Sequence, residues 1–323
     1  MKKTNKKATQ KKVRQVVYPP PIDIGDTIGL VAPAGPLINK DNFTAGVQVL
    51  EKKGFKVKFN HKLLSASGYL AGSDQERTDE FNSLWADPEV KALVAARGGY
   101  GCLRMIDRID LKQIRKNPKI LIGFSDLTVL LNAIHKKTRL VTFHGPVATT
   151  LASIDRPSTK SFFDTLLGQA PMHMTPGRLK ILNRGNARGT LLGGNLTTLV
   201  HMLGTPYEFP WNNTILFTED IGESPYRLDR LLTHLDMANR LQKIQGLILG
   251  SFSDDSRKKN RAMQRAVHKR AVELLQKTDI PIWANFPTGH CRRNLTLPIG
   301  VKVEMDSSAG TVAVQESSFH SSS

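Results

Sequence analysis

The chain has 323 residues, 40% of them hydrophobic and 23% charged, and a formal net charge of +18 at pH 7. These proportions are typical of a soluble globular protein that is long enough for two domain cores. No run of 18 apolar residues occurs, which excludes a transmembrane helix. Two cysteines, Cys102 and Cys291, cannot build a disulfide framework, lack the spacing of metal ligands and fit a reducing compartment.

Residues 1–16 form the most basic part of the chain. They contain seven lysines and arginines and no acid, but the apolar stretch of a secretory signal is missing. We therefore expect a disordered basic tail and a cytoplasmic location. The tail has no interleaved aromatic residues, which argues against specific nucleic-acid binding. A second basic cluster is interpreted as a solvated helix face and comprises Arg257, Lys258, Lys259, Arg261, Arg265, Lys269 and Arg270.

Residues 17–150 alternate short apolar runs with helical patterns. The expected strands cover residues 27–33, 55–59, 90–96, 119–123 and 140–143. The expected helices cover residues 43–50, 75–85, 103–109 and 127–134. This alternation predicts an α/β domain whose mostly parallel sheet is flanked by helices.

Residues 151–185 contain three prolines, and we expect a connector there with one helix at 160–167. Residues 186–316 then predict a smaller α/β C-terminal domain with additional short strands. Its expected strands cover residues 214–217, 247–252, 282–286, 295–298, 301–304 and 311–315, and its expected helices 196–203, 227–238 and 263–276. The serine-rich end, 317–323, is expected to fray.

The apolar run before Ser125 ends at Gly123-Phe124-Ser125-Asp126 and passes directly into a helical pattern. A serine at such a strand-to-helix turn is typical of a hydrolase nucleophile, because the turn exposes the hydroxyl near free backbone N–H groups. The alternative is an ordinary turn in which Ser125 or Asp126 caps the helix.

A serine nucleophile needs a histidine base and an acid that orients it. Of the nine histidines, His144 and His290 follow expected strands beside glycine, where side chains can reach a cleft. Three acids, Glu219, Asp220 and Glu223, follow the expected strand at 214–217. They can orient a histidine or cap the next helix, and the residues alone do not separate these roles.

Several separated motifs occur in a fixed order along the chain. They are GLVAPAG (29–35), ARGGYG (96–101), GFSD (123–126), FHGP (143–146), GGNL (193–196), ED (219–220), YRLDR (226–230), LGSF (249–252) and GH (289–290). Together they resemble the LD-carboxypeptidase (muramoyltetrapeptide carboxypeptidase) family of serine peptidases, which includes the microcin C self-immunity peptidases. The resemblance covers residues 24–311.

The resemblance implies a role for three of these residues. Ser125 matches the nucleophile, His290 the general base and acid, and Glu219 the acid that orients the histidine. With Ser125 in one domain and the other two in the second, the active site should straddle the cleft between them. The order of the three is that of α/β-hydrolases, but the second glycine of their nucleophile turn is missing, so we interpret the likeness as convergence.

An oxyanion hole is expected from the backbone N–H of Asp126 and from the Gly98-Gly99 turn, where glycine allows close approach of a substrate. The alternative for this turn is a phosphate-binding loop or a plain connector. Arg97, Tyr100, Arg227 and Arg230 are candidate substrate contacts, although each arginine can equally be structural.

The resemblance further implies cleavage of murein tetrapeptide at its LD bond, release of terminal D-alanine, and a homodimer. No metal or organic cofactor is indicated. Two alternatives stay open. One is a related peptidase that cleaves a peptide–nucleotide antibiotic, and the other is a polyanion-binding protein with an inactive triad.

Overall fold

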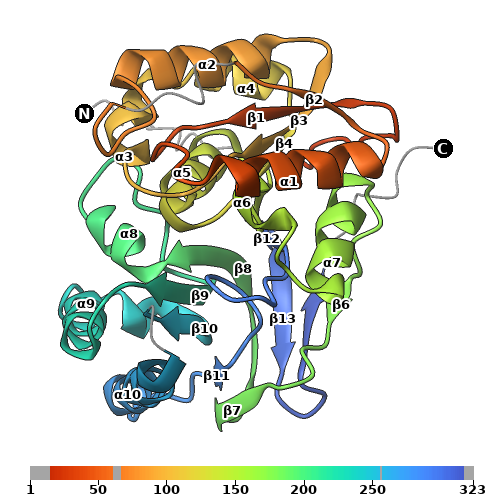
Figure 1. Cartoon of the computed structure of the whole chain (residues 1–323). Coiled ribbons are helices and arrows are strands. Elements are labelled where there is room, and N and C mark those ends of the chain that lie inside the picture. Colours follow the sequence, from red (N-terminus) through yellow and green to blue (C-terminus); the bar gives the residue numbers. More distant parts are fainter. Residues whose placement is uncertain (1–14, 61–66, 255–256, 316–323) are drawn as a thin grey trace, which may run out of the picture.

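The computed structural model describes residues 15–60, 67–254 and 257–315, which form two β-sheets with helices packed around them (Figure 1). The tails predicted at 1–16 and 317–323 lie outside these residues, apart from 15 and 16. Within the described ranges, no helix combines the length and apolar character needed to cross a membrane.

The first sheet has six strands in the order β12-β5-β4-β3-β1-β2. Their bounds are β1 Thr27–Val31, β2 Lys56–Lys58, β3 Val90–Ala95, β4 Ile120–Gly123, β5 Thr142–His144 and β12 Leu297–Ile299. Strands β1 to β5 run parallel to one another, whereas β12 runs antiparallel to β5. The predicted parallel sheet is therefore confirmed.

Helices cover both faces of this sheet, and α1 and α2 lie on opposite sides of β1 (Figure 1). Their bounds are α1 Lys40–Lys52, α2 Asp74–Ala86, α3 Cys102–Met105, α4 Leu111–Lys116, α5 Thr128–Thr138, α6 Ala148–Leu151 and α7 Arg156–Leu166. Side chains fix where the two long helices begin: Asn39 caps α1, and Ser73 forms a capping box with Glu76 at α2. The single helix expected at 103–109 is shorter, because α3 ends at Met105 and a 3₁₀ helix follows.

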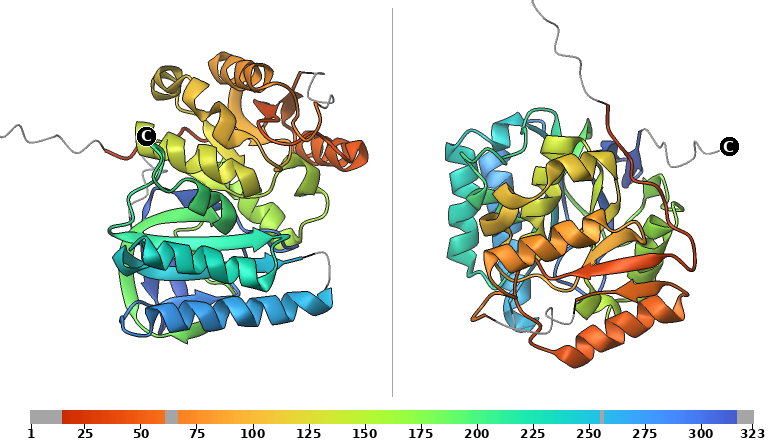
Figure 2. Two further views of the ribbon diagram at one scale, coloured as in Figure 1. Left: turned by 90° about the vertical axis from the view of Figure 1, so that its left-hand side faces the viewer. Right: turned by 90° about the horizontal axis from the view of Figure 1, so that it is seen from above.

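The second sheet has eight strands in the order β6-β14-β13-β8-β9-β10-β11-β7. Their bounds are β6 His173–Met174, β7 Lys180–Asn183, β8 Asn186–Asn195, β9 Thr214–Ile221, β10 Ile244–Ser253, β11 Ile282–Ala284, β13 Lys302–Asp306 and β14 Thr311–Val314. Strands β8 to β11 are parallel, and the strands outside them are antiparallel. The helices are α8 Leu196–His201, α9 Pro225–Met237 and α10 Arg257–Leu275, the last two side by side on one face (Figure 2).

Two parts of the chain differ from the sequence-based expectation. The strand expected at 295–298 among those of the C-terminal domain is β12, and it completes the first sheet instead. Its Pro298 fits there because β12 is an edge strand, where the missing N–H of proline does not interrupt a ladder. The connector expected at 151–185 contributes β6 and β7, the two edge strands of the second sheet.

Candidate active site

The turn after β4 places Ser125 at the start of a 3₁₀ helix, Ser125–Leu127, that continues into α5. Ser125 has φ 64°, in the left-handed region that non-glycine residues seldom occupy. The strand before it is fully buried, whereas Ser125 is half-buried and lines a cavity. The local backbone is therefore strained at the residue that the sequence singled out.

Asp126 holds the neighbouring loop in place. Its carboxylate accepts a hydrogen bond of 2.7 Å from the backbone N–H of Cys102, the first residue of α3. Burial raises the pKa of Asp126 above its usual value. Neither Ser125 nor Asp126 caps the helix that follows, so the alternative of an ordinary N-cap is wrong.

The loop between β3 and α3 touches Ser125 through glycine. A Cβ atom on Gly98 would lie 2.7 Å from Ser125 Cβ and 2.9 Å from its Oγ, closer than real Cβ atoms approach other atoms. Gly99 has φ 127°, another conformation that side chains disfavour. The loop thus needs glycine to bring its backbone against the serine.

His290 and Glu219 form a hydrogen-bonded pair at the end of the second sheet. Nδ1 of His290 lies 2.7 Å from Glu219 Oε2, and the backbone N–H of His290 donates to the same oxygen at 3.2 Å. Gly289, at φ 98°, makes this approach possible, because a Cβ there would lie 2.5 Å from Glu219 Cγ. The carboxylate is completely buried.

The pair shifts the pKa of both members toward the ionised forms. Burial alone would lower the pKa of His290, but the charge of Glu219 and the hydrogen bond to it raise that pKa above its ordinary value. Burial alone would raise the pKa of Glu219, but His290 holds it below its ordinary value. Glu219 is therefore a carboxylate that can orient His290 and stabilise its protonated form.

The other two candidate acids, Asp220 in β9 and Glu223 just after it, bind other groups. Asp220 accepts hydrogen bonds from Asn195 Nδ2, from the backbone and hydroxyl of Thr197, and from the backbone of Ile221. Burial and the charge of Glu219 raise the pKa of Asp220 to about 6 despite these donors. Glu223 forms an ion pair of 3.5 Å with Arg227. The structure thus separates three acids that the sequence alone could not.

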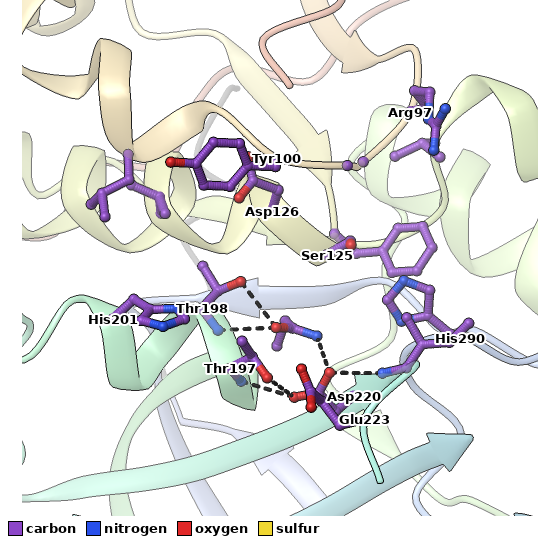
Figure 3. A pocket seen from close by; sticks show the side chains of 18 of the residues that line it. Arg97, Tyr100, Ser125, Asp126, Thr197, Thr198, His201, Asp220, Glu223 and His290 are labelled. Atoms are coloured by element: carbon purple, nitrogen blue, oxygen red, sulfur yellow. Dashed lines mark hydrogen bonds between the residues drawn. The ribbon is translucent and has the colours of Figure 1, made fainter. Parts of the chain in front are cut away.

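A cavity of about 730 Å³ lies between the two sheets and is lined by residues of both (Figure 3). It brings together most of the candidate residues: Arg97, Gly98, Gly99, Tyr100, Ser125, Asp126, Asp220, Glu223 and His290. Polar lining residues that the sequence analysis did not select are Thr149, Thr150, Asn195, Thr197, Thr198 and His201. Of these residues, only Asn195 lies in one of the sequence motifs, GGNL, which could have drawn attention to it.

The four candidate substrate contacts fall into two pairs. Arg97 and Tyr100 line the cavity, whereas Arg227 and Arg230 lie on α9 and are not among its lining residues. Arg97 donates a hydrogen bond of 2.6 Å to Pro36 O, and burial lowers its pKa. Arg227 and Arg230 instead pack over the Tyr226 ring, 6.0 and 5.5 Å from its centroid. Their predicted substrate role gains no support from this geometry.

Arg97 has no acidic counterion among the residues that the structure describes. In the part of the chain that the structure describes, no carboxylate lies within ion-pair distance of its guanidinium. Among the same residues, no cluster of three or more His, Cys, Asp or Glu could hold a metal ion. The cavity that Ser125 lines therefore also contains a partly buried cation with no carboxylate partner in the described ranges.

Comparisons with known proteins match most of this chain. Residues 28–145 match the LD-carboxypeptidase N-terminal domain, and residues 188–305 match the LD-carboxypeptidase C-terminal domain. The probable murein peptide carboxypeptidase of Bacillus subtilis (strain 168) is 37% identical over 92% of this chain and 94% of the relative. The Microcin C7 self-immunity protein MccF of Escherichia coli is 29% identical over 92% of this chain and 95% of the relative.

Solved structures of two such proteins have a similar fold. MccF in the wild-type apo state superposes with a TM-score of 0.85 at 28% identity, covering 93% of this chain and 99% of that one. The muramoyltetrapeptide carboxypeptidase from Oxalobacter formigenes superposes with a TM-score of 0.75 at 29% identity, covering 88% of this chain and 97% of that one.

Proposed function

The chain belongs to the LD-carboxypeptidase family, and from this membership we propose that it is a serine carboxypeptidase acting on murein tetrapeptide. Its substrate bond joins an L-configured centre to the terminal D-alanine. Ser125 is the nucleophile, His290 the general base and acid, and Glu219 the residue that orients His290. The observation that carries the proposal is the buried Glu219–His290 pair facing the cavity that Ser125 lines.

In the proposed reaction, Ser125 Oγ attacks the carbonyl carbon while Nε2 of His290 takes the hydroxyl proton. Glu219 holds Nδ1 of the ring, so Nε2 is the nitrogen left for this step. His290 then returns the proton to the nitrogen of D-alanine as the C–N bond breaks. A water molecule, deprotonated by His290, hydrolyses the resulting ester and restores Ser125. In the described part of the chain no hydrogen bond yet joins Ser125 to His290, and such contacts commonly tighten only when substrate binds.

Two further features of the cavity support this assignment. Backbone N–H groups of Asp126 and of the Gly98-Gly99 loop are the proposed oxyanion hole, because glycine brings that loop against Ser125. Arg97 is the proposed partner of the substrate's free terminal carboxylate, since no carboxylate of the described residues forms an ion pair with its partly buried guanidinium. Tyr100 lines the same cavity and is a proposed substrate contact.

A second candidate function is hydrolysis of a peptide–nucleotide antibiotic. The structural similarity to MccF favours it, whereas the higher sequence identity to a murein peptide carboxypeptidase favours the first candidate. A homodimer in the cytoplasm stays a prediction for either activity, and light scattering on the purified protein would measure the oligomeric state.

The deciding experiment compares D-alanine release from purified murein tetrapeptide by the wild type and by Ser125→Ala. We expect release by the wild type and loss of it in the variant. Equal release by both proteins would overturn the assignment of Ser125. If the folded wild type released nothing, hydrolysis of a microcin C-type conjugate would identify the second candidate. Salt-sensitive polyanion binding without any hydrolysis would instead identify a binding protein.

A further inference from the structure

His144 is a buried histidine that the proposed mechanism does not use. It is the last residue of β5, its side chain is completely buried, and neither ring nitrogen has a hydrogen-bond partner in the structure. Buried polar groups are nearly always hydrogen-bonded, because an unpartnered one costs free energy of folding. A histidine in this position therefore calls for a specific explanation.

The surroundings of His144 place it beside the Glu219–His290 pair. Its ring lies 5.0 Å from Phe217, which points to the same face of β9 as Glu219 two residues later. Its ring also lies 6.0 Å from Phe124, which in turn lies 4.6 Å from His290. His144 thus reaches from the first sheet to the buried acid of the second.

Glu219 offers an unpartnered atom on its side of this contact. Its Oε2 accepts from the ring and backbone of His290, but its buried Oε1 has no partner. The hydroxyl of Thr288 is buried and unpartnered as well. Thr288 and Glu219 flank Gly250, whose added Cβ would lie 2.8 Å from Thr288 Cγ2 and 3.2 Å from Glu219 Cβ. The His144 ring and the Thr288 hydroxyl are therefore two unpartnered groups beside a buried carboxylate oxygen that is itself unpartnered.

We propose that His144 is a positioning residue for this site, donating a ring N–H to a buried water that Thr288 also contacts and that in turn donates to Glu219 Oε1. The proposal rests on the proposed function, since it assigns how the orienting acid is itself held. A buried water commonly makes about three hydrogen bonds, which is the number these groups supply. In metal sites, histidine and carboxylate ligands are oriented in the same way, by hydrogen bonds to residues that do not touch the metal.

His144 is suited to this role because it stays neutral. Burial lowers the pKa of His144 to about 4, against the opposing charge of Glu219. At neutral pH it therefore carries one N–H donor and one acceptor nitrogen. The titratable groups that face Glu219 are His290, Asp220 and the thiol of Cys291. The pKa of His290 is raised whereas that of His144 is lowered, so His144 is already neutral at the pH where His290 loses its proton.

The test measures kcat, KM and the pH profile of kcat/KM for His144→Phe, His144→Gln and His144→Asn. Phenylalanine keeps the ring but removes both nitrogens, whereas the two amides restore a donor near one nitrogen or the other. The matched control is His135→Phe on α5, because His135 is also buried, also has an unpartnered nitrogen and lies outside the cavity lining. Thr288→Val removes the hydroxyl that would also contact the proposed water.

For His144→Phe we expect a loss of kcat of about tenfold with KM nearly unchanged. The acidic limb of the kcat/KM profile should move to higher pH. Glu219 without its second hydrogen bond stabilises protonated His290 more strongly and so raises the pKa of His290. One of the two amide variants should recover most of the loss, and Thr288→Val should shift the limb in the same direction. These changes should be absent in His135→Phe.

The proposal is overturned if His144→Phe keeps the wild-type kcat and acidic limb, if neither amide variant recovers activity, or if the His135 control behaves identically. Should His144→Phe fail to fold, the amide variants and Thr288→Val decide by the same readouts. Equal activity of Ser125→Ala and the wild type would instead refute the proposed function itself.

Discussion

The exits of two parallel strands, β4 and β9, place their functional residues by opposite physical means. At β4 the chain exposes Ser125 through a left-handed backbone conformation beside glycine. At β9 the chain buries Glu219 completely and leaves it facing His290. The comparison teaches that the proposed nucleophile stands on a half-buried, strained turn, whereas the proposed orienting acid is buried beside a partner that lowers its pKa.

The comparison is tested most strongly at the two adjacent acids of β9. We expect Glu219→Gln to lower kcat by about a thousandfold or more, because an amide neither fixes the ring of His290 nor stabilises its charge. Asp220→Asn should lower kcat by less than about tenfold, since Asp220 accepts from Asn195 and Thr197 rather than from His290. Steady-state kinetics on the tetrapeptide checks both values.

Thermal unfolding of the same two variants supplies the control. Asp220→Asn should unfold at lower temperature, because the amide replaces one acceptor with a donor that faces Asn195 Nδ2. Equal kinetic losses in the two variants would contradict the separation of roles.

Two glycines of positive φ separate the effect of backbone strain from that of a steric clash with Glu219. Gly289→Ala should lower kcat by about a hundredfold, because its Cβ would push Glu219 away from His290. Gly222→Ala, at φ 82° with nothing within 4 Å of its Cβ, should leave kcat unchanged. Both should lose roughly 1 kcal/mol of stability from the backbone conformation. Denaturant unfolding and kinetics on both proteins measure the two effects, and loss of activity in Gly222→Ala would count against the argument.

Substitution of Arg97, which lines the same cavity as Ser125, should have the next smaller effect on catalysis. We expect Arg97→Ala to lower kcat/KM by about 10- to 100-fold, as the loss of one charge-assisted contact to a terminal carboxylate predicts. Arg227→Ala, on the exposed face of α9, should have little effect. A substrate amidated at its C-terminus should react equally with wild type and Arg97→Ala. A persisting difference between the two proteins on the amide would contradict the carboxylate contact.

The sequence was informative where a local pattern determines the structure. The alternation of strands and helices predicted the parallel sheet, and the turn at 123–126 stood out because an apolar run met a helical pattern at a serine. The family resemblance then assigned roles to Glu219 and His290. These roles depend on contacts between segments far apart in the chain, which spacing alone cannot reveal.

The expectations that were wrong also involve long-range contacts. Strand β12 joins the first sheet through His144 and Phe143, residues more than a hundred positions away. Strands β6 and β7 are short edge strands whose pairing partners are likewise distant. His144 itself looked like a candidate base, but only its burial shows that it lies behind the site. Neither pairing nor burial depth is encoded in a local period.

A third strand exit, at β1, extends the comparison to Glu80, an acid that forms no ion pair with any of the described residues. Glu80 of α2 accepts a hydrogen bond of 3.2 Å from the backbone of Ala32, the residue after β1. Burial raises the pKa of Glu80 to about 7, whereas His290 keeps the pKa of Glu219 low. The pKa of Glu219, with His290 beside it, therefore favours the carboxylate, whereas the pKa of Glu80 is shifted toward the neutral acid.

We expect this difference to appear as a small, pH-dependent gain in stability for Glu80→Gln. The folded pKa lies above the unfolded value, so the folded state binds more protons between about pH 4.5 and 7 and loses stability as pH rises through that range. The amide keeps an acceptor for Ala32 and removes the charge. The melting temperature should then rise by about 3 °C at pH 8 and change little at pH 5. A rise of equal size at both pH values would show that packing, not ionisation, is the cause.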